Sequence, residues 1–476
     1  MSIPGLGYIA PAPPPGSAAA AAALVETTTI KLEPFWEYRF EVPASTTLTV
    51  RLVSGTAEKD GTELAPNTPY VFTRLKSKIN TWQTCELEIT SPNPDGYHAY
   101  VSKPTTPDQT SLVSYLNLHM KLEAARTQHR SSGENNISAA GMGPRVLVCG
   151  PVNTGKTTLV RMLTAWGQPM VINTDPTHGM LSPPGTLSAS VFATIMDITT
   201  EWGGTPSSGP TAIPVKLPLS YMYGLRTPEE NPKLYRALVS RLAAATTSRL
   251  AEDPEVRKSG MVLDTGDLSL TTNPAGYEAL AHVVSEFSVN LVVALGSERI
   301  TADLTRRFAG QKTTLGEEIV VMGLEKSGGA VERDASFMQG VTEAAIKEYF
   351  FGDVRRNLSP HTQSVPFDAV TIWKVVEDST TASSDDDYYD PAASETSLEK
   401  VEPSLAMASC LLAVVYANVH DDPDTIRDAN VMGYVWVAGV DEAKRKLKLT
   451  APVPTRLGDR PMVFGNYPEP VIGLTG

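Results

Sequence analysis

Eight consecutive residues have the types and spacing that bind phosphate groups. They fit the pattern GxxxxGK[ST] and read Gly150-Pro151-Val152-Asn153-Thr154-Gly155-Lys156-Thr157. Lys156 is expected to face the β- and γ-phosphates of a nucleotide, Thr157 offers a hydroxyl to magnesium, and the Thr158 hydroxyl can reach the α-phosphate. Gly150 and Gly155 are expected to leave room for phosphate oxygens to approach the backbone amides.

The segments on either side of this pattern suit a phosphate site. The apolar run 145–149 predicts a buried strand and 156–166 predicts an amphipathic helix, so amides and the helix dipole would face a polyphosphate. Asp175 ends the next run, PMVINTD, and is predicted to lie near the metal; Asp264, in GMVLDTGD, is a weaker candidate. Because no NKxD-like sequence follows the run NLVVAL, adenine is favoured over guanine, and the predicted ligands are ATP and Mg²⁺.

Three regions of different periodicity must position these residues. Residues 26–130 contain short runs of period two and then a helical pattern, which predicts a β-sandwich domain with a linking helix. Residues 141–350 alternate apolar runs with helical patterns, which predicts an α/β P-loop NTPase core with a doubly wound, mostly parallel sheet. Residues 351–476 return to short β-like runs and predict a β-rich C-terminal domain.

Two segments lack the apolar periodicity of a folded domain. Residues 1–25 are rich in proline, glycine and alanine, and residues 377–400 carry eight carboxylates and one lysine, a local charge of −8 + 1 = −7. Neither segment can bury enough apolar surface to offset the entropy of ordering. We therefore expect a disordered tail at 1–25 and a disordered acidic insert at 377–400.

Composition narrows the classes of function. With 476 residues, 41% of them hydrophobic, the chain can bury a large core spread over several domains. Its net charge of −13 argues against a general electrostatic grip on nucleic acid. The three cysteines form no CxxC pair, which argues against a disulfide framework or a cysteine zinc site and favours the cytosol or nucleus. No segment is expected to be a signal peptide or to span a membrane.

Several longer strings together resemble the Clp family, the eukaryotic RNA 5′-hydroxyl kinases and their relatives in the pre-mRNA 3′-end cleavage machinery. The strings are EYRFEV, GTELAPNTPYVFT, AYVSKPTTP, YLNLHMKLE, GPVNTGKTTL, NPKLYRALVSRL, EKSGGAVERD and IKEYFFG. The resemblance covers about 27–476 and is greatest to the fungal branch, the Clp subunit of cleavage factor IA. It implies that the adenine is held where the N-terminal domain meets the core, at Glu37 and Lys76.

The catalytic motif of that family is altered in this chain. Active members carry D-x-G-Q, whose aspartate acts as general base on the RNA 5′-hydroxyl, whereas this chain reads DPTH from Asp175. A tryptophan that would stack on the substrate base is also missing from the run after the third strand. Arg299, with Arg306 and Arg307, resembles the arginine lid over the transferring phosphoryl group, and a solvated helix face is the alternative interpretation.

The resemblance and these departures imply a non-catalytic, ATP-binding subunit of the nuclear pre-mRNA 3′-end cleavage and polyadenylation machinery, acting as an assembly scaffold. Its partners would be the scaffold subunit of cleavage factor IA that reads the polymerase tail and other 3′-end processing subunits, with indirect contact to RNA and none to a membrane. The alternative is an active ATP-dependent polynucleotide 5′-hydroxyl kinase, with Asp175 as base and Arg299 in the lid. A generic P-loop ATPase has little support beside the family strings.

Overall fold

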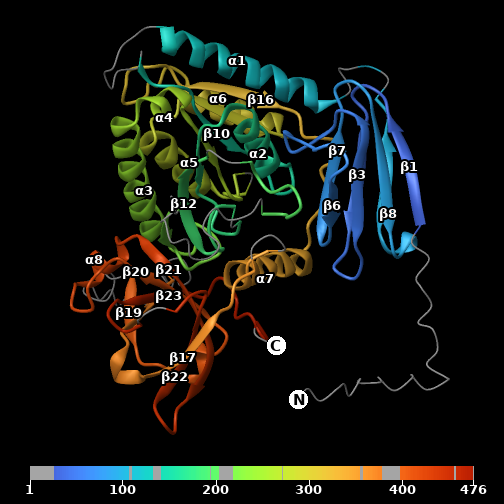
Figure 1. Ribbon diagram of the computed structural model, residues 1–476. Coiled ribbons are helices and arrows are strands. Elements are labelled where there is room, and N and C mark those ends of the chain that lie inside the picture. The colour runs from blue at the N-terminus through green and yellow to red at the C-terminus, as the bar shows by residue number, and fades with distance from the viewer. Residues whose placement is uncertain are drawn as a thin grey trace, which may run out of the picture.

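The chain forms three blocks that follow one another in sequence, as the computed structural model shows (Figure 1). The described residues are 26–104, 106, 110–131, 141–178, 180–192, 195–202, 218–270, 272–353, 357–377, 397–454 and 457–474. The predicted tail at 1–25 and most of the predicted insert at 377–400 lie outside them. The predicted fold class is confirmed: a β-sandwich, an α/β core with a mostly parallel sheet, and a β-rich C-terminal block.

The N-terminal block packs two antiparallel sheets face to face. The first sheet contains, in spatial order, β1 (Glu26–Leu32), β8 (Cys85–Ser91), β3 (Leu48–Gly55) and β6 (Pro69–Phe72). The second contains β5 (Thr62–Glu63), β4 (Glu58–Lys59), β7 (Leu75–Asn80), β2 (Glu37–Val42) and β9 (His98–Ser102). Alternate residues such as Phe40 and Leu87 are buried between the sheets, as the period-two pattern predicts.

A seven-stranded sheet forms the described part of the α/β core. Its order is β13 (Leu219–Met222), β12 (Thr186–Val191), β11 (Met170–Asn173), β14 (Met261–Asp264), β10 (Arg145–Cys149), β15 (Leu291–Leu295) and β16 (Val320–Leu324). The strands from β11 to β16 in this order are parallel, and β12 and β13 extend the sheet antiparallel. The carboxyl ends of β11, β14 and β10 therefore meet at one edge of the sheet.

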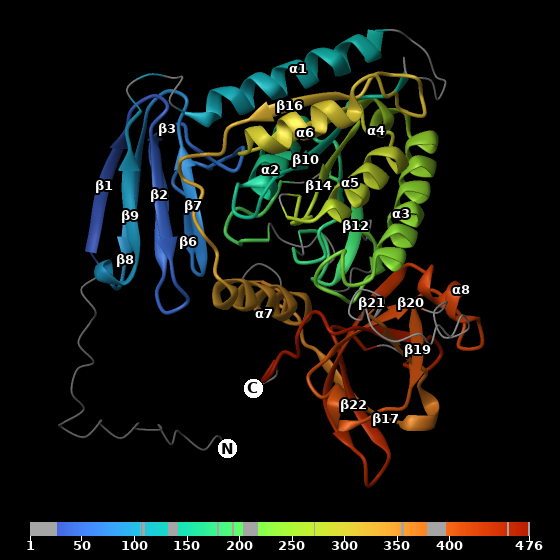
Figure 2. The same ribbon diagram turned by 180° about the vertical axis from the view of Figure 1, so that it is seen from behind.

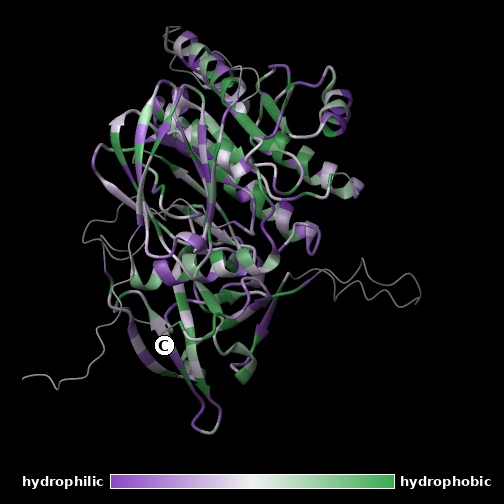
Figure 3. Ribbon diagram, turned by 90° about the vertical axis from the view of Figure 1, so that its right-hand side faces the viewer, coloured by the Kyte–Doolittle hydropathy of each residue, from purple (hydrophilic) through white to green (hydrophobic). Residues whose placement is uncertain are grey.

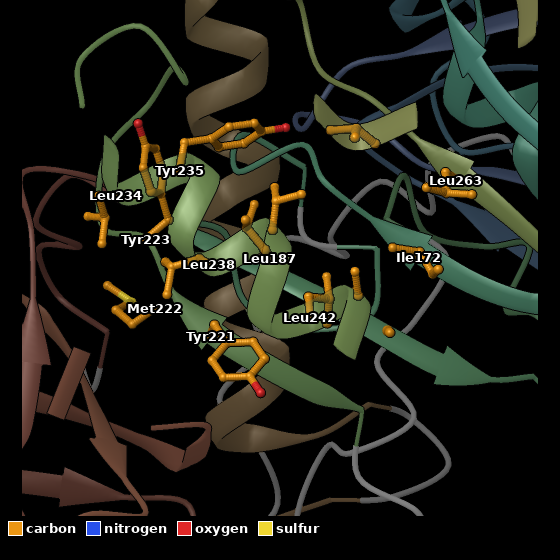
Figure 4. Close-up of a cluster of buried hydrophobic side chains, with 14 of the residues drawn as sticks. Ile172, Leu187, Tyr221, Met222, Tyr223, Leu234, Tyr235, Leu238, Leu242 and Leu263 are labelled. Atoms are coloured by element: carbon orange, nitrogen blue, oxygen red, sulfur yellow. The ribbon is translucent and has the colours of Figure 1, made fainter. Parts of the chain in front are cut away.

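Helices pack around this sheet and connect to the loops at its edge. They are α1 (Ser111–Ser131), α2 (Lys156–Gly167), α3 (Pro232–Glu252), α4 (Pro254–Ser259), α5 (Pro274–Glu286), α6 (Glu298–Phe308) and α7 (Ala335–Phe351). Asn231 caps α3 by accepting a hydrogen bond from the backbone of Leu234. From there α3 packs Leu238 onto Leu187 of β12, within a cluster of buried side chains (Figure 4).

The C-terminal block adds one mixed sheet and a short helix. Its described strands, in spatial order, are β17 (His361–Pro366), β22 (Lys446–Ala451), β21 (Val431–Asp441), β20 (Leu411–Val415), β23 (Met462–Phe464), β18 (Ile372–Val375) and β19 (Leu398–Val401), and α8 spans Pro423–Arg427. Hydrophobic residues concentrate on the strands inside the molecule (Figure 3). Trp436 of β21 shares one buried cluster with Tyr349 of α7, so an apolar interface joins this block to the core.

The interface between the sandwich and the core is more polar than the interface between the C-terminal block and the core. Its own hydrophobic cluster is largely separate from the core clusters, and polar groups make several of the contacts between the two blocks. Arg74 donates to the backbone of Gly340, at 2.5 Å, and Lys78 donates to the Ser327 hydroxyl at 3.0 Å. Seen from behind, α7 lies below the core sheet, between the sandwich and the C-terminal block (Figure 2).

Candidate functional site

The phosphate-loop residues form a tight turn between β10 and α2. Gly150 has a φ of 150°, and a Cβ there would lie 2.4 Å from the carbonyl oxygen of Leu295 on β15. Gly155 has a φ of 89°, and a Cβ there would meet no atom within 4 Å. Packing on β15 and the left-handed backbone therefore restrict these two positions to glycine, a different reason from the phosphate approach expected from the sequence.

The start of α2 offers free backbone donors beside a lysine. Gly155 is the N-cap residue and supplies no side-chain hydrogen bond to the first turn. The Lys156 ammonium is largely buried and donates to the carbonyl oxygens of Gly150, at 3.0 Å, and Pro151, at 2.9 Å. Thr154 also donates to Pro151, at 2.9 Å. An anion at this position would meet the helix dipole, the amides and the Lys156 charge together.

A cavity of about 680 Å³ lies against the phosphate loop. The sequence-predicted site residues that line it are Lys76, Asn153, Thr154, Gly155, Lys156, Thr157, Thr158 and Asp175. Gly150, Glu37 and Arg299 lie outside its lining. The remaining walls come from all three blocks, and include Lys78 of β7, Arg333 after β16 and Tyr467 near the C-terminus. Residues far apart in sequence thus enclose one site.

Glu37 is buried behind the cavity wall. Its carboxylate accepts from Lys78 Nζ at 2.5 Å and from Arg39 Nε at 2.8 Å. Burial opposes its ionisation, but the Lys78 and Arg39 charges outweigh burial and lower the pKa of Glu37. Glu37 lines a separate cavity of about 20 Å³ together with Ser327. Of Glu37 and Lys78, only Lys78 lines the cavity of about 680 Å³.

Lys76 lies on the cavity wall and ties the sandwich to the core. Its ammonium donates to the backbone oxygen of Glu332 at 2.8 Å and pairs with Glu41 at 3.3 Å. It also lies 5.2 Å from the centroid of the Phe337 ring, a cation–π contact. The structure thus places Lys76 at the junction that the family resemblance implied, on the same cavity as the phosphate loop.

Two aspartates lie at the carboxyl ends of neighbouring strands of the core sheet. Asp175 follows β11, and its Oδ1 accepts from the amide (2.8 Å) and the hydroxyl (2.6 Å) of Thr177. Asp264 ends β14, which lies between β11 and β10, and has no exposed surface. Burial raises the pKa of Asp264 to about 6, opposed by the nearby Thr157 hydroxyl. Asp264 is thus on the strand directly beside the phosphate-loop strand, and Asp175 is one strand further away.

The predicted lid arginines lie on the outer face of α6. The Arg299 side chain is 75% exposed and lies 3.9 Å from Asp303, and Arg306 pairs with the same carboxylate. Arg307 pairs with Glu278 at 2.5 Å. In this structure these arginines are on a solvated helix face, the alternative that the sequence left open, and none of them lines the cavity.

A hairpin that the sequence pattern did not single out also reaches the cavity. Lys59 ends β4 and is fully buried, and its ammonium donates to Asp60 in the β4–β5 turn at 2.6 Å. Arg161 of α2 lies 3.3 Å from Asp60, and Arg333 pairs with Glu201 at 2.5 Å. Burial opposes ionisation of Asp60, but Lys59 and Arg161 outweigh it and lower the pKa of Asp60 to about 2. The only signal in the sequence was KDG, which read as an ordinary turn.

Two features are absent from the residues that the structure describes. These residues contain no group of three or more His, Cys, Asp or Glu side chains placed to hold a metal ion. In the same residues, no helix is both long and apolar enough to cross a membrane.

The parallel sheet, the glycine loop and the helix that follows it define a P-loop nucleotide-binding core. Models of known families match the chain in three stretches. Residues 31–129 match the N-terminal beta-sandwich domain of polyadenylation factor, 150–352 the mRNA cleavage and polyadenylation factor CLP1 P-loop, and 358–469 the pre-mRNA cleavage complex II protein Clp1. The chain belongs to the Clp1 family of mRNA cleavage and polyadenylation factors.

Fungal relatives match the chain from end to end. It is 46% identical over 485 residues to the mRNA cleavage and polyadenylation factor clp1 of Botryotinia fuckeliana, and 43% identical over 486 residues to CLP1 of Pyricularia oryzae; both matches cover 100% of each chain. A solved wild-type Clp1p–Pcf11p complex superposes with a TM-score of 0.79 at 27% identity, covering 93% of this chain and 98% of that one. A second, equally similar structure concerns an extended Pcf11p–Clp1p interface and ATP loss in a glycine-to-arginine point mutant.

Proposed function

We propose that this chain binds ATP with Mg²⁺ in the cavity between its blocks and is an ATP-dependent assembly subunit of the nuclear pre-mRNA 3′-end cleavage and polyadenylation machinery. One observation carries the proposal: the phosphate loop forms a wall of a cavity of about 680 Å³ whose other walls come from the sandwich and the C-terminal block. That volume lies within the range of roughly 300–1,000 Å³ for small-molecule sites. A ligand there would contact all three blocks at once.

The side chains around the cavity suit a nucleoside triphosphate. Lys156 would exchange its backbone carbonyl partners for phosphate oxygens, and the amides of Asn153, Thr154 and Gly155 would donate to them. The Thr158 hydroxyl would contact the α-phosphate. When bound, Mg²⁺ would neutralise charge on the β- and γ-phosphates, with ligands from the Thr157 hydroxyl and the Asp175 carboxylate.

The adenine would lie on the side of the cavity formed by the sandwich. Lys76 lines this wall, and Lys78 extends it, held in place by the buried carboxylate of Glu37. We therefore assign Lys76 a direct contact with the adenine and Glu37 an indirect role through Lys78. The ATP loss described for a mutant of the Clp1p relative supports an ATP ligand for this chain also.

An assembly role without phosphoryl transfer fits the rest of the site. Arg299 and its neighbours pair with acidic side chains on the outside of α6, and one oxygen of Asp175 is engaged in its own turn. Phosphoryl transfer depends on positioned charge around the phosphate, so these arrangements favour binding over catalysis. The solved Clp1p–Pcf11p complex supports a Pcf11p-like scaffold as the partner of this chain.

A transfer assay separates this proposal from the RNA kinase alternative. Full-length protein is incubated with γ-labelled ATP, Mg²⁺ and a 5′-hydroxyl RNA, and bound nucleotide and labelled RNA are measured from the same sample. We expect about one ATP per chain and no labelled RNA above the Lys156→Ala control. Transfer at ordinary kinase turnovers of roughly 1–100 per second would make the chain an enzyme. A parent protein without nucleotide would contradict ATP binding itself.

A further inference from the structure

A hairpin of the sandwich lies along the helix that begins at the phosphate loop. It consists of β4, the turn at Asp60 and Gly61, and β5, and α2 lies on the side of the core that faces the sandwich (Figure 1, Figure 2). The hairpin contacts α2 at Arg161, Met162 and Trp166, in the second and third turns of the helix. Residues of another block thus contact the helix whose first amides are proposed to bind phosphate.

Glu58 of the hairpin contacts the C-terminal end of α2. Within the sandwich, its buried carboxylate accepts from the Trp82 indole at 2.7 Å and from the Asn80 amide at 3.0 Å. The same carboxylate accepts from the Trp166 indole of α2 at 3.4 Å. The Trp82 and Trp166 rings lie 6.4 Å apart between their centroids. The sandwich therefore orients both a carboxylate and an aromatic ring towards the end of the helix.

The turn of the hairpin approaches the backbone of α2 closely. Gly61 has a φ of 79°, and a Cβ there would lie 2.9 Å from the Met162 Cα and 3.0 Å from the Met162 carbonyl oxygen. Asp60, the residue before it, lies 3.3 Å from Arg161. No side chain larger than hydrogen fits at Gly61 unless the hairpin or the helix moves. The separation between the sandwich and α2 therefore depends on this glycine.

Several of these contacts are made outside the cavity. The contacting residues that do not line it are Glu58, Gly61, Met162 and Trp166. The first turn of α2, at Lys156, Thr157 and Thr158, does line it, and α2 also packs Leu159 and Leu163 into a core cluster. A shift of the helix at the hairpin would move its first amides relative to the loop. Because affinity for an anion depends on that placement, the hairpin can act on a bound phosphate through α2.

We propose that the β4–β5 hairpin positions the phosphate loop through α2 and so contributes to the affinity for the triphosphate of the nucleotide, independently of the base. The inference rests on the proposed binding of ATP. It separates two contributions of the sandwich, since Lys76 would contact the adenine directly whereas Glu58 and Gly61 are positioning residues outside the cavity. A change at the hairpin should therefore weaken every ligand that carries the triphosphate by the same factor.

The test compares ATP with tripolyphosphate, which carries the phosphates without a base. Each ligand is titrated in Mg²⁺ into nucleotide-depleted, full-length protein, for the parent and for Gly61→Ala, Trp166→Phe and Gly310→Ala. Gly310 is the matched control, because it has a φ of 70°, a Cβ there would meet no atom within 4 Å, and it lies outside the cavity lining. We expect Gly61→Ala to lose about tenfold in affinity for both ligands, the order of magnitude of one charge interaction at a helix N-terminus. Gly310→Ala should match the parent.

The outcomes distinguish this inference from the proposed function. A parent that binds neither ligand contradicts the proposed function and the inference with it. A parent that binds ATP but not tripolyphosphate, or a Gly61→Ala variant that is weakened for ATP alone, overturns the inference only. So does a merely structural role of the hairpin, which would lower the melting temperature of Gly61→Ala and leave both affinities of the folded protein unchanged.

Trp166→Phe keeps the test decisive if Gly61→Ala does not fold. This variant retains a ring beside Trp82 and removes the indole that donates to Glu58. We expect a smaller loss than in Gly61→Ala, again equal for ATP and tripolyphosphate. Parent-like affinity of Trp166→Phe for both ligands would overturn the inference in that case.

Discussion

The Lys156 ammonium contacts its own loop in this structure and is also the charge proposed to face bound phosphate. Its ammonium donates to two carbonyls of its own loop, at 3.0 and 2.9 Å, and the same group is the charge that would face the β- and γ-phosphates. Backbone carbonyls are neutral acceptors, whereas phosphate oxygens form charge-assisted hydrogen bonds that are about twice as strong. The present contacts hold the side chain beside the loop, and we expect phosphate oxygens to replace them when a nucleotide binds.

Replacing Lys156 by alanine should remove the nucleotide without unfolding the chain. The variant loses the charge that faces the phosphates but leaves the loop backbone and Thr157 in place. We expect ATP released on denaturing the purified protein to fall from about one equivalent to below a tenth of that, which corresponds to a loss of roughly 100-fold in affinity, about 2.8 kcal/mol. Val152→Ala, in the same loop with 58% exposure, should keep its ATP. Full ATP content in Lys156→Ala would place the main binding determinant elsewhere.

At the scale of single residues, the sequence predicted what is local and missed what depends on tertiary contact. Gly150 to Thr158 are contiguous, so their positions between one strand and one helix followed from the pattern alone. Lys59 and Arg333 are 274 residues apart (333 − 59) and line the same cavity, which no local pattern can indicate. The placement of Asp264 on the strand directly beside the phosphate-loop strand, one strand nearer than Asp175, was likewise not readable from the sequence, because strand order in a parallel sheet does not follow chain order.

At the scale of elements, the prediction from the sequence agreed best with the structure where a strand is buried along its whole length. The run RVLVC is β10 from end to end, because a strand buried on both faces needs an unbroken apolar run and Gly150 ends it. By contrast, β7 (LKSKIN) was not predicted as a strand. Its lysines face the polar interface with the core, so its sequence does not alternate between buried apolar and exposed polar residues. The hairpin of β4 and β5 was read as a turn alone, although it carries the buried pair Lys59 and Asp60 against α2.

Removing the carboxylate of that hairpin should destabilise the whole chain. Asp60→Asn leaves the Lys59 ammonium, with 0% exposure, without its anionic partner and removes the contact with Arg161. Breaking a buried pair on one side costs about 3–5 kcal/mol. Urea unfolding should therefore show a clearly lower midpoint, while Asp95→Asn, at an exposed position of the same block, should match the parent. A parent-like midpoint for Asp60→Asn would show that the ion pair contributes no stability.

Helix α7 should make stability depend on pH near neutrality. Burial, with the negative charges of Asp197 and Asp353, raises the pKa of Glu348 from 4.5 to about 7. Because this folded-state pKa is above the unfolded value, the stabilisation is complete below about pH 4.5 and is lost as pH rises through about 7. Melting temperature should fall from pH 6 to pH 8 in the parent and less so in Glu348→Gln, with Glu343→Gln on the same helix as control. Equal slopes in the parent and Glu348→Gln would contradict this assignment.

At the scale of the whole molecule, the blocks are joined by two kinds of interface. An apolar cluster that includes Tyr349 and Trp436 connects the core to the C-terminal block. Several of the contacts between the sandwich and the core are made by polar and charged groups that surround the cavity, such as Lys76 and Arg333. A bound triphosphate would place further negative charge beside the lysines and arginines that line the cavity at this interface. ATP would therefore stabilise the placement of the sandwich more than that of the C-terminal block.

Hydrogen exchange of the full-length chain with and without ATP and Mg²⁺ tests this central claim most directly. A ligand held by all three blocks should slow exchange in α2 and the phosphate loop, and also in β7 and in residues 327–333, which lie far away in sequence. Lys156→Ala, treated identically, should show none of these changes. Protection confined to the phosphate loop, with β7 and 327–333 exchanging at unchanged rates, would contradict the claim that ATP joins the sandwich to the core.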